Sequence, residues 1–383
     1  MSRTLTTQVQ YALLPLVMLA AVLAMAAGGA WMYLVVLLPT VLATFVDELT
    51  GDQKDDGTYL AAILNFYLLS CLPLVALIAA LAAYYSGGVG PLSGALEALF
   101  GGVGFDLAAN RAATSGLEVT AAILGCGLLM GAGAVNVAHE LTHRANARDY
   151  IVGRWLLAYT YDTTFAIEHV HGHHRNVGTK ADPATARRGE YVLAFVVRST
   201  VGAFVNAFKI EAERAEKRGY PVLSFQNRAI RGQLMTLALI VLHYLIAGWL
   251  GVLFFTIVGL QGKLYLELVN YVEHYGLVRK PGTRVEPRHS WNCNRYVSNA
   301  MLFNLPRHSH HHQFANRPFW QLESLDGAPT MPHGYLTMLI IALYPPLWNA
   351  KVEPLLAAWE EGLATEDERA LIAEDKRRLG WAA

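Results

Sequence analysis

Charged residues are scarce in this chain of 383 residues, because Asp, Glu, Lys and Arg together make up only 16% of it. A typical soluble domain carries about 25%. Basic and acidic residues also balance at 30 each, so no net charge attracts nucleic acid and we expect no nucleic-acid partner. Hydrophobic residues, in contrast, make up 54% of the chain, and many of them lie in runs too long for ordinary core helices.

Cysteine is scarce as well. Cys71, Cys126 and Cys293 are scattered and form no C-x-x-C pair. This spacing excludes a rubredoxin-like or zinc-ribbon module within the chain and gives no disulfide framework. The sequence also lacks a flavin or nicotinamide fingerprint. Any redox reaction at this protein must therefore draw its electrons from another molecule.

Three uncharged apolar runs precede residue 139, at 11–46, 59–85 and 119–138. As one helix, the first would be roughly 54 Å long, against a hydrocarbon core of about 30 Å. Gly28-Gly29 lies near its middle, so we expect two helices there, and residues 1–138 are predicted to form four transmembrane helices. Met1–Gln10 has no compact apolar core ending in a small-residue cleavage site, so we expect the first run to be retained.

Basic residues concentrate between Arg144 and Arg231, which favours the cytoplasmic side for this segment. We predict that residues 139–231 form a cytoplasmic histidine-motif region. Within it, the apolar stretch 191–208 is interrupted by Arg198 and Asn206 and is predicted to lie along the membrane interface. Residues 273–383 are predicted to form a second cytoplasmic histidine-motif region that includes the C-terminus.

The stretch 232–262 contains no Asp, Glu, Lys or Arg and is either one long helix or a hairpin that turns near 248–251. If His143 and His274 bind one metal centre, an even number of crossings separates them. A transmembrane hairpin over 232–272 satisfies this condition, as does a single span there combined with a span at 191–208. We favour the hairpin because Arg198 would be costly at mid-bilayer. The predicted fold is therefore an all-α integral membrane protein with about six transmembrane helices and a cytoplasmic histidine-rich catalytic region.

Histidines gather at the ends of these apolar runs. Of the 14 histidines, all but His243, His289 and His333 fall into four groups, which lie at 139–143, 169–174, 274 and 308–312. His139 and His143, like His169 and His173, are spaced i, i+4, which places both rings on one face of a helix. The H-E-x-x-H pattern at 139–143 resembles a zinc protease motif, but such a site needs only one further ligand.

So many imidazoles exceed what one four-coordinate zinc ion holds, and two metal ions are the economical interpretation. Imidazole alone does not discriminate among zinc, copper and iron. Because the groups lie at the ends of apolar helices, we expect a membrane-dissolved hydrocarbon chain as the substrate. Such a chain has no polar group that could be hydrolysed. Attack on its C–H bonds requires oxygen chemistry, which iron supports and zinc does not.

The order H-x3-H, H-x3-H-H, H-x2-H-H resembles the membrane di-iron superfamily of desaturases and hydroxylases. Asn270-Tyr-Val-Glu-His-Tyr-Gly276 and Leu305-Pro-Arg-His-Ser-His-His-His312 are similar to signatures of one branch, the AlkB-type alkane 1-monooxygenases. The resemblance runs from about His139 to about Tyr335. Pro306 stands where that branch often has Gln, which removes no ligand.

This resemblance implies two iron ions and nine metal ligands: His139, His143, His169, His173, His174, His274, His308, His311 and His312. His171 and His310 fall where the family need not have histidine and are left out. Ligating histidines usually donate their other N–H to a carboxylate or carbonyl. The natural carboxylate partners are Glu140, Glu168, Glu273 and Asp182.

The resemblance also implies the reaction, which is terminal hydroxylation of medium-chain n-alkanes to primary alcohols with O2. It implies rubredoxin as electron donor, with rubredoxin reductase upstream. It also implies a multi-pass protein of the bacterial inner membrane, in contact with membrane lipids and with its active site towards the cytoplasm. Arg175, Lys180, Arg187 and Arg188 are candidates for docking an acidic carrier or for contacting lipid headgroups.

Two rival functions remain open. A fatty-acyl desaturase or lipid hydroxylase would use the same metal centre on a different substrate. A membrane metal transporter would instead line a pathway through the bilayer with its histidines, whereas these histidines are expected at helix ends and beyond.

Overall fold

The computed structural model describes residues 8–53 and 59–378, and within these ranges the chain is helical. Two isolated bridges, Asp52 with Arg295 and Asn292 with Thr330, are the only β pairing of the described residues. The predicted all-α membrane fold is confirmed. Parts of the predicted regions 1–138 and 273–383, namely residues 1–7, 54–58 and 379–383, lie outside the described ranges.

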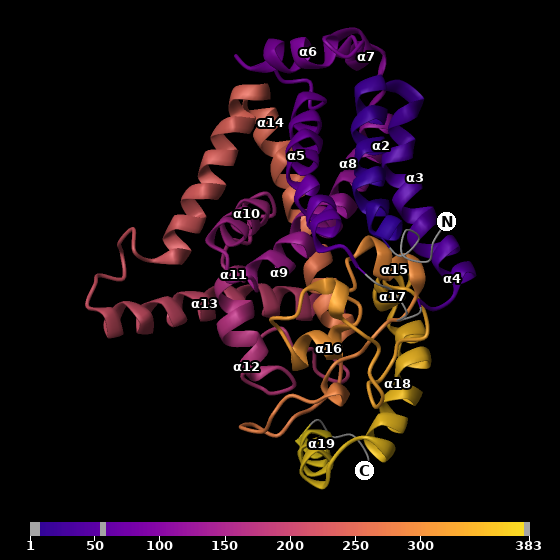
Figure 1. The fold of residues 1–383 in the computed structure, drawn as a ribbon, viewed down its shortest axis with the longest axis vertical. Coiled ribbons are helices and arrows are strands. Elements are labelled where there is room, and N and C mark those ends of the chain that lie inside the picture. The colour runs from indigo at the N-terminus through magenta and orange to yellow at the C-terminus, as the bar shows by residue number, and fades with distance from the viewer. Residues whose placement is uncertain (1–7, 54–58, 379–383) are drawn as a thin grey trace.

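The N-terminal part of the chain forms a bundle of long apolar helices (Figure 1). The chain turns at Gly28–Gly29 as predicted, since Gly28 adopts a φ of 67° between the first two helices. The bundle consists of η1 (Gln10–Ala12), α2 (Leu13–Ala27), η2 (Gly29–Met32), α3 (Tyr33–Val41), η3 (Leu42–Val46), α4 (Asp47–Thr50), α5 (Ala61–Tyr84), α8 (Gly116–Met130), η4 (Gly131–Val135) and α9 (Asn136–Thr142). Short helices α6 (Ser93–Gly101) and α7 (Leu107–Ala113) cap one end of it, opposite the histidines (Figure 1).

Helix α14 (Arg228–His274) is two helices joined by a sharp turn. Ala247 and Gly248 have non-helical backbone angles, and Gly248 has a φ of 62°, a conformation that favours glycine. The turn exposes backbone carbonyls, which other residues satisfy: Leu92 N–H donates to Leu245 O (2.8 Å) and Ser93 Oγ to Ile246 O (2.5 Å). The hairpin therefore has a defined apex beside α6, where Figure 1 shows α14 turning back.

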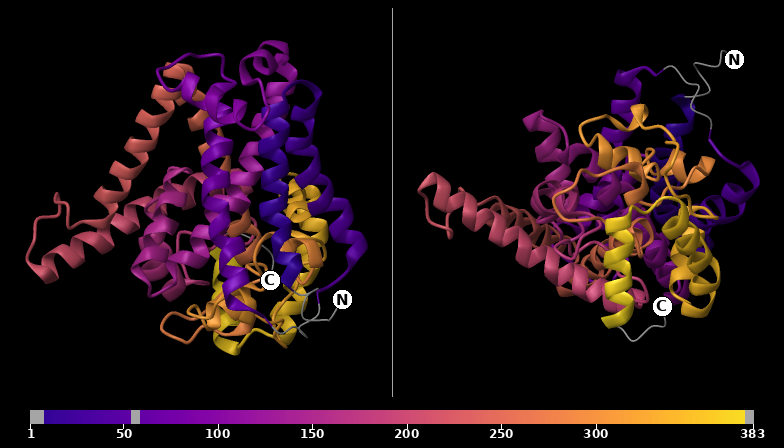
Figure 2. Two further views of the ribbon diagram at one scale, coloured as in Figure 1. Left: turned by 45° about the horizontal axis from the view of Figure 1, so that its top comes forward. Right: turned by 90° about the horizontal axis from the view of Figure 1, so that it is seen from below.

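Helix α13 (Val192–Arg218) runs across the bundle rather than along it (Figures 1 and 2). Its Arg198 side chain forms an ion pair with Glu190 (2.6 Å) and donates to the carbonyl oxygens of Pro183 and Thr185. Among the described residues, six helices are long and apolar enough to cross a membrane by length and composition, and α13 and α14 are among them. Counting α14 as two crossings and α13 as interfacial also gives six, and that division stays a prediction.

The connecting segments and the C-terminal third close the histidine end of the bundle. Between α9 and α13 lie α10 (Ala147–Ala158), α11 (Phe165–Glu168), η5 (His169–His173) and α12 (His174–Asn176). After α14 come η6 (Pro287–His289), α15 (Tyr296–Met301), α16 (His308–Gln313), η7 (Phe319–Gln321), α17 (Tyr335–Ala342), α18 (Pro345–Gly362) and α19 (Glu366–Arg378). A second hydrophobic core, which includes Tyr271, Trp291 and Trp348, packs this region against the end of α14.

Candidate metal centre

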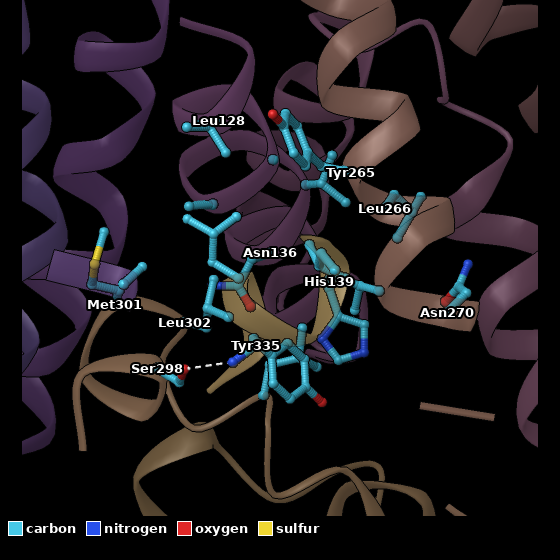
Figure 3. Close-up of a pocket in the computed structure, with 18 of the residues that line it drawn as sticks. Leu128, Asn136, His139, Tyr265, Leu266, Asn270, Ser298, Met301, Leu302 and Tyr335 are labelled. Atoms are coloured by element: carbon cyan, nitrogen blue, oxygen red, sulfur yellow. Dashed lines mark hydrogen bonds between the residues drawn. The ribbon is translucent and has the colours of Figure 1, made fainter. Parts of the chain in front are cut away.

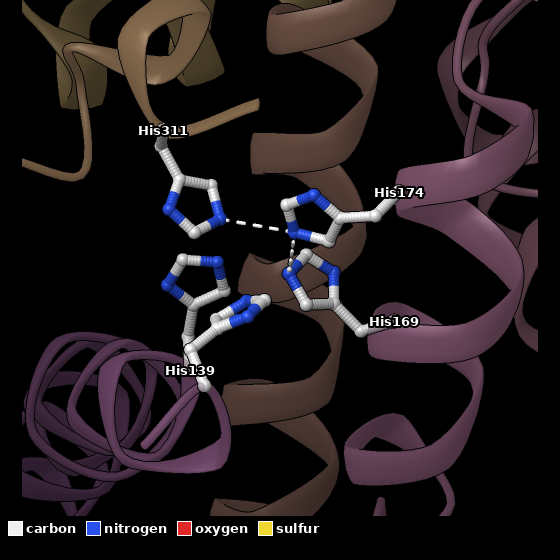
Figure 4. Close-up of side chains that lie close together, drawn as sticks. His139, His169, His174 and His311 are labelled. Carbon is white, nitrogen blue, oxygen red and sulfur yellow. Dashed lines mark hydrogen bonds between the residues drawn. The ribbon is translucent and has the colours of Figure 1, made fainter. Parts of the chain in front are cut away.

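The structure brings the nine predicted ligands together in two adjacent groups. The five-histidine group consists of His139, His143, His169, His174 and His311. The four-histidine group consists of His173, His274, His308 and His312. Within each group, one nitrogen from every ring lies within 4.8 Å of the others. In Figure 4 the labelled rings of the five-histidine group converge from α9, η5, α12 and α16 on one point.

Ring nitrogens within each group are spaced as ligands of one ion. In the four-histidine group, His312 Nε2 lies 2.9 Å from His308 Nε2 and 3.2 Å from His173 Nε2. In the five-histidine group, His174 Nε2 lies 3.0 Å from His169 Nε2 and 3.1 Å from His311 Nε2. Bonds of about 2.0–2.1 Å from imidazole nitrogen to a metal place two ligand nitrogens at about this separation. The buried His139 Nε2 and His143 Nε2 have no hydrogen-bond partner among the described residues, so this donor set fits two metal ions.

In the second motif, the i, i+4 spacing does not show which histidines belong to the same group. His169 and His173 are four residues apart, yet they belong to different groups. The reason is local, because residues 169–173 form a π-helical turn, in which the wider i, i+5 spacing places His169 beside His174. Gly172 lies in this turn, where a Cβ would come within 2.4 Å of Glu168 Oε1. Glycine therefore lets the backbone pass close to a buried carboxylate.

Six of the predicted ligands outside the helical spans are held in the neutral form that binds a metal ion. Burial, together with the charges of neighbouring histidines, lowers the pKa of His169, His174, His308, His311 and His312 well below its usual value. Burial likewise lowers the pKa of His143 to about 4. His173 differs: although burial alone would lower its pKa, the adjacent Asp182 carboxylate raises it.

The four predicted carboxylate partners divide into two pairs. Asp182 Oδ2 lies 2.9 Å from His173 Nδ1, which turns the Nε2 of that ring toward the four-histidine group. Glu273 Oε2 lies 3.2 Å from His308 Nε2, the nitrogen that faces the other rings of its group rather than the remaining ring nitrogen, and the other oxygen of Glu273 accepts a hydrogen bond from Tyr335 (2.7 Å). Glu140 instead pairs with Arg144 (2.9 Å), and Glu168 accepts from Asn206 (3.0 Å).

The remaining histidines lie outside both groups. His171 is exposed and contacts Arg228 (3.3 Å), and His310 accepts a hydrogen bond from Glu323 N–H (2.8 Å). His243 Nδ1 bonds to Leu239 O (2.7 Å) within its own helix rather than to a neighbouring one. His289 pairs with Glu368 (2.7 Å), and His333 with Glu48 (3.3 Å).

An apolar cavity of about 110 Å³, here called the apolar chamber, opens on both groups. His139 and His169 of one group and His308 of the other line it. It extends between α8, α14 and α17, and Figure 3 shows Leu128 and Tyr265 at the end away from His139. Glu273 also lines this chamber, beside His308.

Comparison with known proteins gives the family. A model of the fatty acid desaturase family matches residues 117–341. The chain is 42% identical over 261 residues to alkane 1-monooxygenase 1 of Pseudomonas aeruginosa, which covers 67% of each protein. This chain belongs to the alkane 1-monooxygenase branch of the fatty acid desaturase family.

Two further relatives show the breadth of this membrane di-iron family. The alkane 1-monooxygenase of Ectopseudomonas oleovorans is 37% identical over 253 residues, covering 65% of this chain and 63% of that protein. The hydroxylase component of the xylene/toluene monooxygenase of Pseudomonas putida is 32% identical over 268 residues, covering 69% and 72%. The matched segments thus span about two thirds of these relatives' lengths, and the predicted family is confirmed.

Several residues that line the apolar chamber were not predicted from the sequence. Ser298, Met301, Leu302 and Tyr335 line the apolar chamber although they lie in the region predicted to be cytoplasmic. No signal pointed to the first three, whereas the apolar stretch that begins at Tyr335 gave a hint. Among the four basic residues considered for docking, Lys180 already pairs with Asp375 (2.7 Å) and Arg188 with Glu353 (2.6 Å).

Proposed function

We propose that this protein hydroxylates the terminal methyl group of medium-chain n-alkanes to give primary alcohols. The overall reaction is RH + O2 + 2e⁻ + 2H⁺ → ROH + H2O. The observation that carries the proposal is the apolar chamber, because it brings an apolar substrate to both histidine groups at once. The alkane 1-monooxygenases among the relatives support the same reaction.

Two iron ions are the proposed cofactors. The five-histidine group would hold one ion and the four-histidine group the other, with only neutral nitrogen ligands among the predicted set. When bound, iron supplies the one-electron redox chemistry that activates O2. Asp182 fixes the ring of His173, and the hydrogen bond from Tyr335 fixes Glu273 beside His308, so the protein keeps this end of the site in one geometry.

The apolar chamber performs two tasks in this proposal. Its aliphatic walls, including Leu128, Leu266 and Leu302, exclude water from the reacting end. They also align the chain so that one terminal carbon, rather than a mid-chain methylene, reaches the histidine end. Tyr265 and Leu128 lie at the end away from His139, where they would limit how long a substrate can be.

Electrons come from a separate protein, for which we propose rubredoxin reduced by rubredoxin reductase. Free surface for such an acidic carrier remains at Arg175 and Arg187, since Lys180 and Arg188 are paired within the chain. The proposed location is the bacterial inner membrane, with the histidine end towards the cytoplasm. The basic segment between Arg144 and Arg231 supports that orientation.

Product identification tests the proposed function. The purified, iron-loaded protein receives octane and a reduced donor, and in parallel a membrane lipid with saturated acyl chains. We expect 1-octanol from octane and unchanged acyl chains. Desaturated or hydroxylated acyl lipid without 1-octanol would instead assign the protein to the desaturase or lipid hydroxylase alternative. Toluene in a third reaction shows whether aromatic methyl groups, which the name of the xylene/toluene relative suggests, are also substrates.

A further inference from the structure

A second, smaller cavity lies against the same two histidine groups and is lined mainly by polar and charged side chains. Its volume of about 10 Å³ is room for about one water molecule. We call it the polar chamber, and its titratable lining residues are Asp162, Glu168, His169, His173, Lys263 and Glu267. The two chambers share only Phe165, His169 and Asn270, which form the wall between them.

Lys263, Asp162 and Glu267 form a cluster of ion pairs, and burial increases along it toward Glu267. Lys263 Nζ donates to Asp162 Oδ2 and to Glu267 Oε1, each at 2.6 Å. Exposure falls along the cluster, from 13% for the side chain of Lys263 and 8% for Asp162 to 1% for Glu267. Asn270 Nδ2 donates to the other oxygen of Glu267 at 3.4 Å, so this carboxylate ends at the wall of the apolar chamber.

A purely structural role accounts poorly for the cluster. Lys263 and Glu267 lie in a helix that is long and apolar enough to cross a membrane, where ionisable side chains are costly. One lysine faces two carboxylates, and a third carboxyl group, that of Glu168, lines the same chamber. Ser199 Oγ, fully buried in the wall of the chamber, has no hydrogen-bond partner among the described residues. These features suit a site that holds water.

The reaction proposed above consumes two protons in each turnover, and the aliphatic walls of the apolar chamber provide no route for them. We propose that the polar chamber holds a water molecule and that Glu267, aligned by Lys263 and Asp162, passes protons through it toward the metal centre. The inference rests on the proposed function. Per turnover, an external one-electron donor supplies two electrons, one atom of O2 enters the C–H bond, and the other takes up both protons and leaves as water.

The first test removes the proton-carrying group with little change of shape. Glu267→Gln in the full-length, iron-loaded protein should lower the alcohol formed per electron consumed by about tenfold or more. Released hydrogen peroxide should rise correspondingly, and the rate of alcohol formation should show a larger ratio between H2O and D2O. The KM for octane should stay unchanged because the apolar chamber is untouched. Glu267→Asp should restore part of the yield.

A matched control separates proton delivery from the loss of a buried ion pair. Glu211 is also a fully buried carboxylate, and it pairs with Arg228 at 2.7 Å, away from the polar chamber. Glu211→Gln should leave the alcohol yield per electron and the isotope ratio as they are in the unaltered protein. If both variants lower the yield equally, with equal loss of bound iron, the cluster is structural and the proposal is wrong.

A second variant avoids the ion pairs altogether. Ala203 lines the polar chamber from α13, and Ala203→Ile should fill the space of the water molecule. The alcohol yield per electron should again fall, while Val201→Ile on the exposed side of the same helix should change nothing. An unchanged yield in Ala203→Ile and Glu267→Gln would overturn the proposal. Absence of alcohol from the unaltered protein would instead contradict the proposed function, so the two failures are distinguishable.

Discussion

Both chambers contact the two histidine groups, with His169 in common, but their linings differ. The apolar chamber has about 110 Å³ and walls from the helix bundle, whereas the polar chamber has about 10 Å³ and a lining of acids, a lysine and histidines. The two linings suit two different reactants. A hydrocarbon needs a dry passage, and the reduction of O2 needs protons, so each reactant has its own approach to the metal centre.

The largest expected effect comes from removing a ligand of the metal centre that both chambers contact. His274→Ala removes a ligand of the four-histidine group, and we expect the loss of bound iron and a fall in alkane hydroxylation of more than about 100-fold. Metal analysis and product formation on membranes that contain equal amounts of protein measure this. His171→Ala is the matched control, because His171 is exposed and outside both groups. Full activity in His274→Ala would remove His274 from the ligand set.

Asp182 anchors the histidine that lies beside the polar chamber. Asp182→Asn should weaken the hold on His173, and loss of such a partner typically reduces metal affinity or activity about 10–100-fold. Glu140→Gln should have a much smaller effect on iron content, since Glu140 pairs with Arg144 rather than with a histidine ring. Titration of both variants with ferrous iron compares them, and equal affinities would contradict the orienting role of Asp182.

The apolar chamber alone should govern chain length. Tyr265 lies at the end of the chamber away from His139, and Tyr265→Ala should shift kcat/KM in favour of longer n-alkanes by about tenfold or more. The alcohol yield per electron should not change, because the polar chamber is intact. Competition between alkanes of different length measures the shift. Tyr244→Ala, at an exposed position on the first half of the same helix, is the control and should leave the length preference unaltered.

A carboxylate outside both chambers should affect stability without affecting chemistry. Burial alone would raise the pKa of Glu368, but hydrogen bonds from His289, the Thr365 N–H and Arg288 lower it to about 2. This folded-state value lies below the unfolded-state value of about 4.3. The ionised group therefore stabilises the fold above about pH 4, and that stability is lost as the pH falls toward 2.

Glu368→Gln should accordingly lower the thermal midpoint by about 4 °C at pH 7, with a difference that shrinks in acid. Circular dichroism during heating measures the midpoint, and Glu374→Gln on the exposed side of α19 serves as the control. The alcohol yield per electron should be the same in all three proteins. A difference that persists unchanged at pH 3 would show that Glu368 does not stabilise the fold as an anion.

The sequence was sufficient for the parts that depend on composition and spacing. The absence of charge between 11 and 46 and the pair Gly28–Gly29 predicted two helices, and the turn at Gly248 lies where the hairpin was expected. The two turns follow from local rules. The nine ligands that the family resemblance implied come together in the two histidine groups.

Other features depend on contacts between distant segments and could not be predicted in this way. The π-helical turn at 169–173 exchanges the partners of His169 and His173, and no residue in the motif signals it except Gly172. The polar chamber combines Asp162 with Lys263 and Glu267 across about a hundred positions. Nothing in the sequence placed Lys263 and Glu267 beside Asp162, although their i, i+4 spacing permits an ion pair within the helix.

The most direct test of the account follows the oxygen atoms. The iron-loaded protein, supplied with octane and a reduced one-electron donor, turns over under ¹⁸O2 in ordinary water, and mass spectrometry measures the label in the product. We expect 1-octanol that carries one ¹⁸O atom, with the second atom released as water. An alcohol that carries oxygen from water, or an alkene in place of the alcohol, would contradict it.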